Sequence, residues 1–368
     1  MKSKHFLFYL VHPAKFHFHK VQINTLKAKG HSVDIVINTK DILEELVREE
    51  GWEYTNIFPN TRKIKGVHVY IAAGISLLLS IYRLWKITRK KKYDLYIGDA
   101  LVYLGRIQRV PSFYPTDDVL SAVPEQVTWF IPANFIIAPQ VTDIGKYKYK
   151  KVAYKGYKAL AHLHPNHFIP DRLKLLKNLQ EGEPYFLIRC TGFGATHDIN
   201  KTGITDEVLF KLEELLIPHG KLLITSERQL PEKLEKYRLS IKKNDMKHFI
   251  AFAKIFIGDS TTMSTEAAVL GTPSVEFDDY FYEIEQMIEL EEKYNLIHCF
   301  KTTHEKDMYN KIEDLLQISN IKEIYLKRRE QLINETIDVS AFLIWLFENY
   351  PASTKSYFEN PEIQNKFK

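Results

Sequence analysis

Short apolar runs of strand length alternate with longer helical segments through the first third of the chain. Uninterrupted apolar runs are typical of parallel strands that are buried on both faces. The segments between them carry helix signals, such as the stop at Lys29-Gly30. This alternation predicts a doubly wound parallel sheet. The expected strands are residues 5–11, 33–37, 54–58, 95–99 and 111–114, and the expected helices include 41–50, 71–89 and one that begins at residue 100.

A second alternation of the same kind begins at residue 185. Residues 140–182 are rich in Lys, Tyr, His and Pro and lack a clean period, so we place the connection between two domains there. We predict an α/β protein with an N-terminal domain at 1–160, a C-terminal domain at 161–350 and a polar, mobile tail at 351–368. Both domains are expected to be Rossmann-like and to face a central cleft, because open α/β sheets bind ligands at the carboxyl ends of their strands.

The composition is that of a globular protein long enough for two domains, with 368 residues, 45% of them hydrophobic and 26% charged. A net charge of +5 favours anionic partners. The basic residues are dispersed and form no nucleic-acid motif, so we expect no nucleic-acid partner. Cys190 and Cys299 give neither a metal-ligand spacing nor a disulfide framework, which favours a reducing cytoplasm. The apolar start runs into Val11-His12-Pro13 without a cleavage site, so it fits a first strand better than a signal peptide.

Residues 255–275 are the most informative stretch. They predict a buried strand, a turn of small residues, a short helix, a Gly-x-Pro break and a second strand. The opening of a helix has unpaired N–H groups and partial positive charge, so it can hold a phosphate. An ordinary crossover helix with a Ser or Thr N-cap is the alternative. The nucleotide-binding candidates here are Asp259, Ser260, Thr261, Thr262 and Glu266.

This stretch and four others together resemble a known protein superfamily. The other four are residues 11–20, 115–118, 154–165 and 189–198. From about residue 5 to about residue 345, the chain resembles the GT-B superfamily of UDP-N-acetylglucosamine 2-epimerases and many glycosyltransferases. Within it, the closer resemblance is to a family of largely unassigned function. The resemblance implies a GT-B-like fold with a nucleotide-sugar donor, and it implies that Glu266 binds the ribose hydroxyls.

Two further loops are candidates for the donor site. Gly192 and Gly194 follow a strand, and such a glycine turn lets the backbone approach a pyrophosphate. The resemblance implies that this loop faces the diphosphate, which makes Arg189 and His197 candidate contacts; for His197 the alternative is a hydrogen bond to Asp198. The resemblance also suggests that Ser226 and Glu227 contact the base, with a plain surface loop as the alternative.

The N-terminal half is expected to supply the acceptor site or the catalytic groups. His12, Lys15, His17 and His19 share the first predicted loop, where a metal site is disfavoured because no Cys or carboxylate completes the set. His17 as a general base is the better hypothesis.

Asp99 and the pair Asp117-Asp118 follow other predicted strands. Carboxylates from neighbouring strand ends suit acid/base work, because their pKa values can be pushed apart. The 2-epimerases carry an aspartate and a glutamate in comparable loops. This chain has Asp-Asp in place of the glutamate and lacks the basic His-Arg-Arg-Glu signature. Helix N-capping is the alternative role for Asp117 and Asp118.

Residues 69–92 combine an uncharged stretch, 69–82, with a basic end. The uncharged part is too short to span a bilayer, but an apolar helix with basic residues can lie on an anionic membrane surface. A buried helix whose basic C-terminus complements the helix dipole is the alternative. Membrane contact would suggest a lipid-linked acceptor.

Three functions are compatible with these features. The first is a metal-independent glycosyltransferase that uses a nucleotide-sugar, with UDP as the expected nucleotide, and a lipid-linked or glycan acceptor in surface polysaccharide or glycolipid assembly. The second is a UDP-N-acetylhexosamine 2-epimerase, and the third is a binding protein that keeps the fold without a reaction. No cofactor is expected, and the expected location is the cytoplasm, at the inner face of the membrane.

Overall fold

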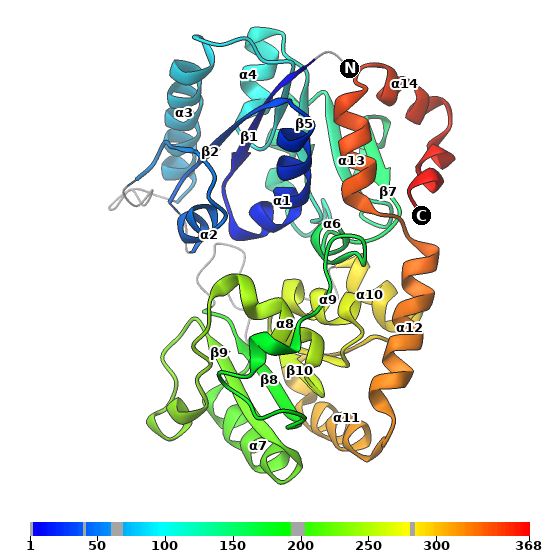
Figure 1. Ribbon diagram of the computed structural model, residues 1–368. Coiled ribbons are helices and arrows are strands. Elements are labelled where there is room, and N and C mark those ends of the chain that lie inside the picture. Colours follow the sequence, from blue (N-terminus) through cyan, green and yellow to red (C-terminus); the bar gives the residue numbers. More distant parts are fainter. Residues whose placement is uncertain (1–2, 40–41, 60–68, 193–202, 280–283) are drawn as a thin grey trace. The chain divides into compact units, whose positions relative to one another are not determined.

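The computed structural model describes residues 3–39, 42–59, 69–192, 203–279 and 284–368. The chain forms two compact units (Figure 1). Unit 1 contains residues 1–162 and 337–368, and unit 2 contains residues 163–336. Each unit is built on a parallel sheet with helices around it, so the predicted α/β class with two parallel-sheet domains is confirmed.

In the described part of unit 1, seven strands form a sheet in the order β3-β2-β1-β4-β5-β6-β7. All of its strand pairs are parallel, and β1 pairs with β2 and β4 at the centre. The β1 segment HFLFYL is buried along nearly its whole length, as its apolar run predicted. The strands are β1 (His5–Leu10), β2 (Ser32–Ile37), β3 (Thr55–Asn56), β4 (Leu95–Ile97), β5 (Ser112–Pro115), β6 (Phe135–Pro139) and β7 (Lys151–Tyr154).

The helices of unit 1 come from both ends of the sequence. Helix α13 (Val339–Glu348) packs against α1 (Pro13–Ala28), and a buried hydrogen bond of 3.1 Å from Gln22 Nε2 to Ser340 Oγ joins them. The others in the described segments of unit 1 are α2 (Leu43–Glu49), α3 (Val69–Thr88), α4 (Leu101–Gln108), α5 (Val127–Phe130) and α14 (Ala352–Glu359), and α6 (Leu160–Leu163) ends where unit 2 begins.

The C-terminal segment differs from the sequence-based expectation. We predicted a second domain up to residue 350 and a separate polar tail, but residues 337–368 belong to unit 1. Tyr357 is buried, and its hydroxyl accepts from Ala153 N and donates to Ala153 O, both at 2.9 Å. Gln364 Oε1 accepts from Lys155 N at 2.8 Å. These side chains satisfy the outer edge of β7, which would otherwise expose unpaired backbone groups.

Unit 2 has a five-stranded parallel sheet in its described residues, in the order β12-β11-β10-β8-β9. Strand β12 was not predicted, because we expected helical structure after residue 281. The strands are β8 (Tyr185–Cys190), β9 (Lys221–Ser226), β10 (Ile255–Gly258), β11 (Ser274–Phe277) and β12 (Ile297–Phe300). The α-helices described after β8 are α7 (Asp206–Leu216), α8 (Met246–Phe252), α9 (Thr261–Leu270), α10 (Glu285–Glu292), α11 (Glu305–Gln317) and α12 (Ile321–Glu335).

The contacts of Tyr357 generate a stability prediction. Tyr357→Phe keeps the ring but removes the hydroxyl that pairs with both backbone groups of Ala153. We expect the free energy of unfolding to fall by about 1–3 kcal/mol, because the Ala153 groups lose their partner. Urea denaturation of the full chain measures this. The control is Tyr149→Phe, at an exposed tyrosine, and an equal effect of both substitutions would contradict the role of the C-terminal segment.

Candidate functional site

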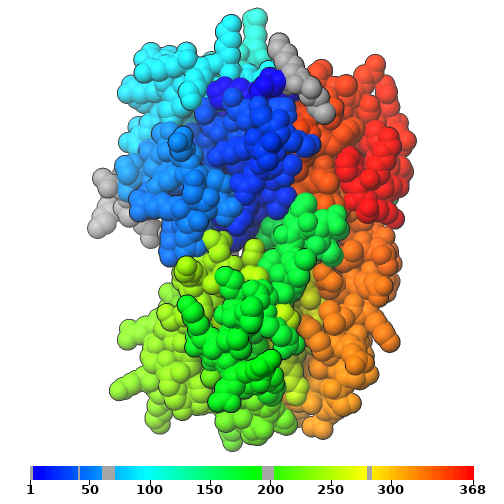
Figure 2. All heavy atoms as spheres, in the orientation of Figure 1, coloured from blue at the N-terminus to red at the C-terminus, as the bar shows by residue number. Residues whose placement is uncertain are grey.

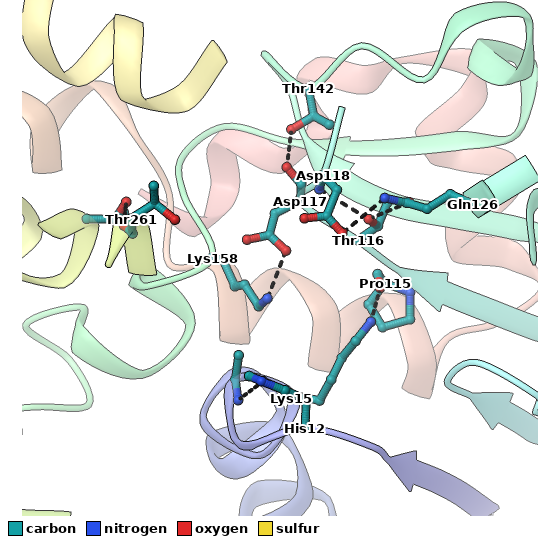
Figure 3. A network of polar contacts seen from close by, with 12 residues as sticks. His12, Lys15, Pro115, Thr116, Asp117, Asp118, Gln126, Thr142, Lys158 and Thr261 are labelled. Atoms are coloured by element: carbon teal, nitrogen blue, oxygen red, sulfur yellow. Dashed lines mark hydrogen bonds and ion pairs between the residues drawn. The ribbon is translucent and has the colours of Figure 1, made fainter. Parts of the chain in front are cut away.

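The polar residues predicted for unit 1 lie just after the carboxyl ends of parallel strands. His12 and Lys15 follow β1, Asp99 follows β4, and Asp117 and Asp118 follow β5. Because β1, β4 and β5 are neighbours in one parallel sheet, their carboxyl ends share one edge. Figure 3 shows this edge, with Lys15 pointing towards Pro115 and Lys158 towards Asp117.

Lys158 forms the central ion pair of this group. Its Nζ donates to Asp117 Oδ1 at 2.8 Å, and both side chains are largely buried. Burial lowers the pKa of Lys158, but the carboxylates of Asp117, Asp118 and Asp99 outweigh burial and raise this pKa above its ordinary value. Lys158 therefore stays charged. We did not select it from the sequence, although it lies in one of the stretches that carry the family resemblance.

Asp118 is held by a second set of side chains. Its Oδ2 accepts from Gln126 Nε2 at 3.0 Å, and its backbone N–H donates to Thr116 Oγ1 at 3.2 Å. The Thr116 hydroxyl donates to Gln126 Oε1 at 2.8 Å, which closes the group. No described helix begins directly after Asp117 or Asp118, so the alternative that they cap a helix is wrong. Their carboxylates are fixed by Lys158 and Gln126 instead.

Asp99 pairs with the second lysine of this edge. Lys15 Nζ lies 3.6 Å from Asp99 Oδ1, donates to the Pro115 carbonyl and lies 5.1 Å from the centre of the Tyr114 ring. The turn before Asp99 requires Gly98, whose φ is 128° and whose added Cβ would meet the Tyr9 carbonyl at 2.5 Å. The structure therefore brings Asp99, Asp117 and Asp118 to one sheet edge with two lysines that balance part of their charge.

The histidines after β1 lie on a helix and not in an extended loop. Helix α1 begins at Pro13, and His12 caps it by accepting from Ala14 N at 3.1 Å. His19 is buried in the core, where burial lowers its pKa to about 3 and Gln22 hydrogen-bonds its ring. His17 is partly exposed, and its ring centre lies 5.3 Å from that of His162. In the described segments, no group of three or more His, Cys, Asp or Glu is placed to hold a metal ion.

In unit 2, the carboxylate of Glu227 binds two of the groups that we expected to bind a diphosphate, Arg189 and the backbone N–H of Gly192. Glu227 forms an ion pair with Arg189 through Oε1, and its Oε2 accepts from Gly192 N at 3.2 Å. Arg189 also donates to Thr225 Oγ1 at 3.3 Å. The structure thus brings Arg189, Gly192 and Glu227 together, whereas Gly194 and His197 lie outside the described residues.

Asp259 positions the backbone on both sides of the segment 193–202. Its Oδ1 accepts from Thr191 N at 2.7 Å and its Oδ2 from Ile204 N at 3.1 Å. Burial raises the pKa of Asp259 to about 6, and the two backbone N–H groups oppose this shift. In the structure this buried carboxylate satisfies the backbone N–H groups of Thr191 and Ile204. Its contact with a nucleotide stays a prediction.

Helix α9 begins as the sequence predicted, with Ser260 as the N-cap residue. The Ser260 side chain makes no capping hydrogen bond in the structure, so the alternative of an ordinary Ser cap is not what is observed. Thr261 is partly exposed and Thr262 is exposed, and both belong to the first turn. The opening of α9 therefore keeps the N–H groups and partial positive charge that suit an anion. Glu266 lies further along α9 and is partly buried; its role stays a prediction.

Ser226 forms a local turn, in which its hydroxyl donates to Arg228 O at 2.8 Å and accepts from Arg228 N at 3.1 Å. Whether Ser226 contacts the base stays a prediction. Glu276, in the middle of β11, was missed. It is fully buried, accepts from the Ser264 hydroxyl, and has a pKa raised well above its ordinary value by burial and by the Asp278 carboxylate. The available signal was a lone acidic residue inside an apolar strand.

The Lys158–Asp117 pair generates a coupling prediction. A double-mutant cycle compares Lys158→Met, Asp117→Asn and the double variant with the wild type. We expect the losses in unfolding free energy of the two single variants to add up to more than the loss in the double variant. The coupling should be about 1–3 kcal/mol, because each single variant leaves one largely buried charge without its partner. Urea denaturation of the four proteins measures it. Additive effects would show that the ion pair contributes nothing to unit 1.

Asp259 generates a pH prediction. Because its folded pKa is raised from 3.8 to about 6, the folded state binds more protons than the unfolded state between these values. The contribution of Asp259 to stability is therefore greatest below pH 3.8, is lost as the pH rises towards 6, and is constant above that. Denaturation of the wild type and Asp259→Asn at several pH values measures the difference. We expect it to change between these two values and to be flat above; a constant difference throughout would contradict the assignment.

Comparison with known proteins relates this arrangement to solved structures. No protein-family model matches the sequence. No functionally curated protein matches it either. The UDP-GlcNAc 2-epimerase from Neisseria meningitidis, solved bound to UDP-GlcNAc, is 12% identical with a TM-score of 0.67, covering 94% of this chain and 100% of that one.

Two other solved structures are similar over nearly their whole length. The S. aureus MnaA–UDP co-structure is 13% identical with a TM-score of 0.66, covering 95% of this chain and 97% of that one. The glycosyltransferase of kitacinnamycin is 11% identical with a TM-score of 0.63, covering 95% and 99%. The same fold thus serves epimerases and glycosyltransferases. At these identities the likeness establishes the architecture, and the chain has the GT-B fold that the sequence resemblance implied.

Proposed function

We propose that the protein is a metal-independent glycosyltransferase with a UDP-sugar donor. The observation that carries this proposal is the group of anion-binding donors at the ends of β8 and β10. It consists of the Arg189 guanidinium, the Gly192 N–H and the opening of α9 at Ser260. Two structures with the same fold, one with UDP and one with UDP-GlcNAc, support the choice of nucleotide.

In this proposal the carboxylate of Glu227 binds the Arg189 guanidinium and the Gly192 N–H in the absence of the nucleotide, and the diphosphate displaces it. Its carboxylate pairs with Arg189 and Gly192, and more than half of its side-chain surface is exposed, so it can move into solvent. A diphosphate carries more negative charge than one carboxylate and would replace it at the guanidinium. The Arg189 side chain is much less exposed, which keeps the guanidinium in place while the anion changes.

The proposed reaction transfers the sugar to an acceptor hydroxyl. The hydroxyl oxygen forms a bond to the anomeric carbon, the bond from that carbon to the diphosphate oxygen breaks, and UDP leaves with the bonding electrons. Arg189 and the opening of α9 stabilise the departing charge, as preorganised donors do, so this step requires no metal ion. The hydroxyl proton passes to a base in unit 1, for which His17, Asp117 and Asp118 are the candidates. A glycan or lipid-linked acceptor fits this chemistry.

A UDP-N-acetylhexosamine 2-epimerase is the second candidate. The observation that favours it is the set of three carboxylates, Asp99, Asp117 and Asp118, at one edge of the unit 1 sheet beside two lysines. Such a set can remove and return a proton on a sugar carbon. A binding protein that keeps the fold without a reaction is the third candidate, and it would show nucleotide affinity without turnover.

Incubation of the purified full chain with a panel of UDP-sugars, followed by mass spectrometry, separates the three candidates. For a transferase we expect binding without turnover until a lipid extract or glycan is added, and then UDP together with a glycosylated product. Solvent deuterium at C2 of the sugar would establish the epimerase instead. Binding without any product under either condition would support the binding protein, and absence of all nucleotide binding would overturn the donor site.

Two variants with opposite effects test the donor site by calorimetry with UDP. Glu266→Ala should weaken binding roughly tenfold or more, because it removes a charged hydrogen-bond acceptor from the ribose. Glu227→Gln should strengthen binding several-fold, because the anion no longer competes with a carboxylate at Arg189. Glu313→Ala, at an exposed position of α11, is the control. If both site variants bind UDP as the control does, these residues are not part of the site.

A further inference from the structure

Helix α3 has its large apolar side chains on the outside. Ser76, Ser80, Leu84 and Thr88 recur at spacings of four residues, and all are buried. The solvent-facing side carries large apolar and aromatic residues instead. They are Ile71, Ile75, Leu78, Leu79, Tyr82 and Trp85. This is the reverse of an ordinary surface helix, whose polar residues face water.

The inner face of α3 is satisfied within unit 1. Ser80 Oγ donates to the Ser76 carbonyl at 2.7 Å, and Thr88 Oγ1 accepts from Gln108 Nε2 of α4 at 2.9 Å. Leu84 belongs to the hydrophobic core, and Leu77 and Ile81 pack against it. The outer face is therefore not the side through which α3 packs on unit 1. Leu78 and Ile71 keep 68% and 58% of their surface exposed, far more than a core residue would.

The segment that carries this face is strongly basic, and among its described residues Lys91 pairs with the acidic Asp34 of β2 at 2.6 Å. Residues 54–93 contain nine Lys and Arg and no Asp or Glu. Lys86 Nζ lies 4.6 Å from the centre of the Tyr82 ring, and the Arg89 guanidinium lies 4.8 Å from that of Trp85. Lys90 and Lys92 follow and are exposed. Aromatic rings with adjacent cations beside an apolar face are typical of segments at a membrane interface.

We propose that the outer face of α3, together with the basic residues at its C-terminal end, binds an anionic membrane surface. The apolar residues enter the headgroup region, and the cations contact lipid phosphates. Figure 1 shows α3 along the outside of unit 1, and Figure 2 shows its light-blue segment at the molecular surface. A second copy of the chain could cover the apolar residues, but residues 54–93 offer it no acidic group to neutralise the cations.

By length and composition alone, Ile71–Thr88 is long and apolar enough to cross a membrane. This window is longer than the uncharged stretch 69–82 because it includes Arg83 and Lys86. The helix continues without interruption through Arg83 and Lys86. A single helix of this kind is weak evidence for a membrane span. One side of α3 packs on the core of unit 1, so the geometry favours a helix that lies along the surface of the bilayer.

Vesicle flotation with the full chain tests this proposal, and no nucleotide is needed. We expect binding to vesicles of phosphatidylcholine mixed with phosphatidylglycerol, and much weaker binding to phosphatidylcholine alone. Ile71→Gln/Leu78→Gln should lower the partition coefficient roughly tenfold by removing apolar contact. Lys90→Gln/Lys92→Gln should lower it roughly tenfold as well, because each cation contributes near an anionic surface.

Matched variants in unit 2 control for hydrophobicity and charge. Ile169→Gln/Leu173→Gln changes two residues that are 81% and 73% exposed, and Lys242→Gln/Lys243→Gln removes the same net charge. Both should bind vesicles as the wild type does. Brominated lipids should quench the fluorescence of the wild type more than that of Trp85→Phe.

Three outcomes would overturn the proposal. They are absence of vesicle binding, equal binding to neutral and anionic vesicles, and equal effects of the α3 and control variants. A dimer in sedimentation that Ile71→Gln/Leu78→Gln converts to a monomer, without vesicle binding, would instead assign the face to a second copy of the chain.

Discussion

The pairing of charges at the ends of parallel strands is the constraint on which the arrangement of both units depends. A parallel sheet collects its loops at one edge, where side chains are partly removed from water. A charged group can stay there only with a partner. In unit 1 the partners are lysines, which hold Asp99 and Asp117. In unit 2 the guanidinium of Arg189 holds Glu227, and backbone N–H groups hold Asp259.

The two units use this constraint in different ways. The edge of unit 1 concentrates carboxylates that are fixed by Lys15, Lys158 and Gln126, which favours chemistry on a hydroxyl or a carbon-bound proton. The edge of unit 2 concentrates hydrogen-bond donors, and the anion that they bind in the structure is the carboxylate of Glu227, whose side chain is more than half exposed.

Helix α3 shows that a hydrophobic pattern alone does not reveal which face is inside. The sequence indicated an apolar helix with a basic end and left open whether that helix was buried or lay on a membrane. Its buried face uses small hydroxyl side chains, Ser76 and Ser80, which allow close packing, and the Ser80 hydroxyl donates to the backbone carbonyl of Ser76. The large apolar side chains of α3 therefore lie on its outer face. Only the packing of α3 on unit 1 separates these two faces.

Local pattern determined most of the fold, because buried parallel strands are continuous apolar runs and helix starts and stops depend on nearby residues. The strands β1, β2, β8, β9 and β10 and the start of α9 were predictable for this reason. Strand β7 and the return of residues 337–368 to unit 1 were not, because an edge strand is completed by side chains such as Tyr357 that lie about two hundred positions away.

The site divides in the same way. The sequence by itself placed Asp99, Asp117, Asp118 and Asp259 after strands and Arg189 at the end of a strand, since strand ends are local features. Only the tertiary structure decided which partners these residues have: Lys158 pairs with Asp117, Glu227 pairs with Arg189, and Asp259 accepts from Thr191 N. Each contact depends on which strand ends become neighbours in the sheet.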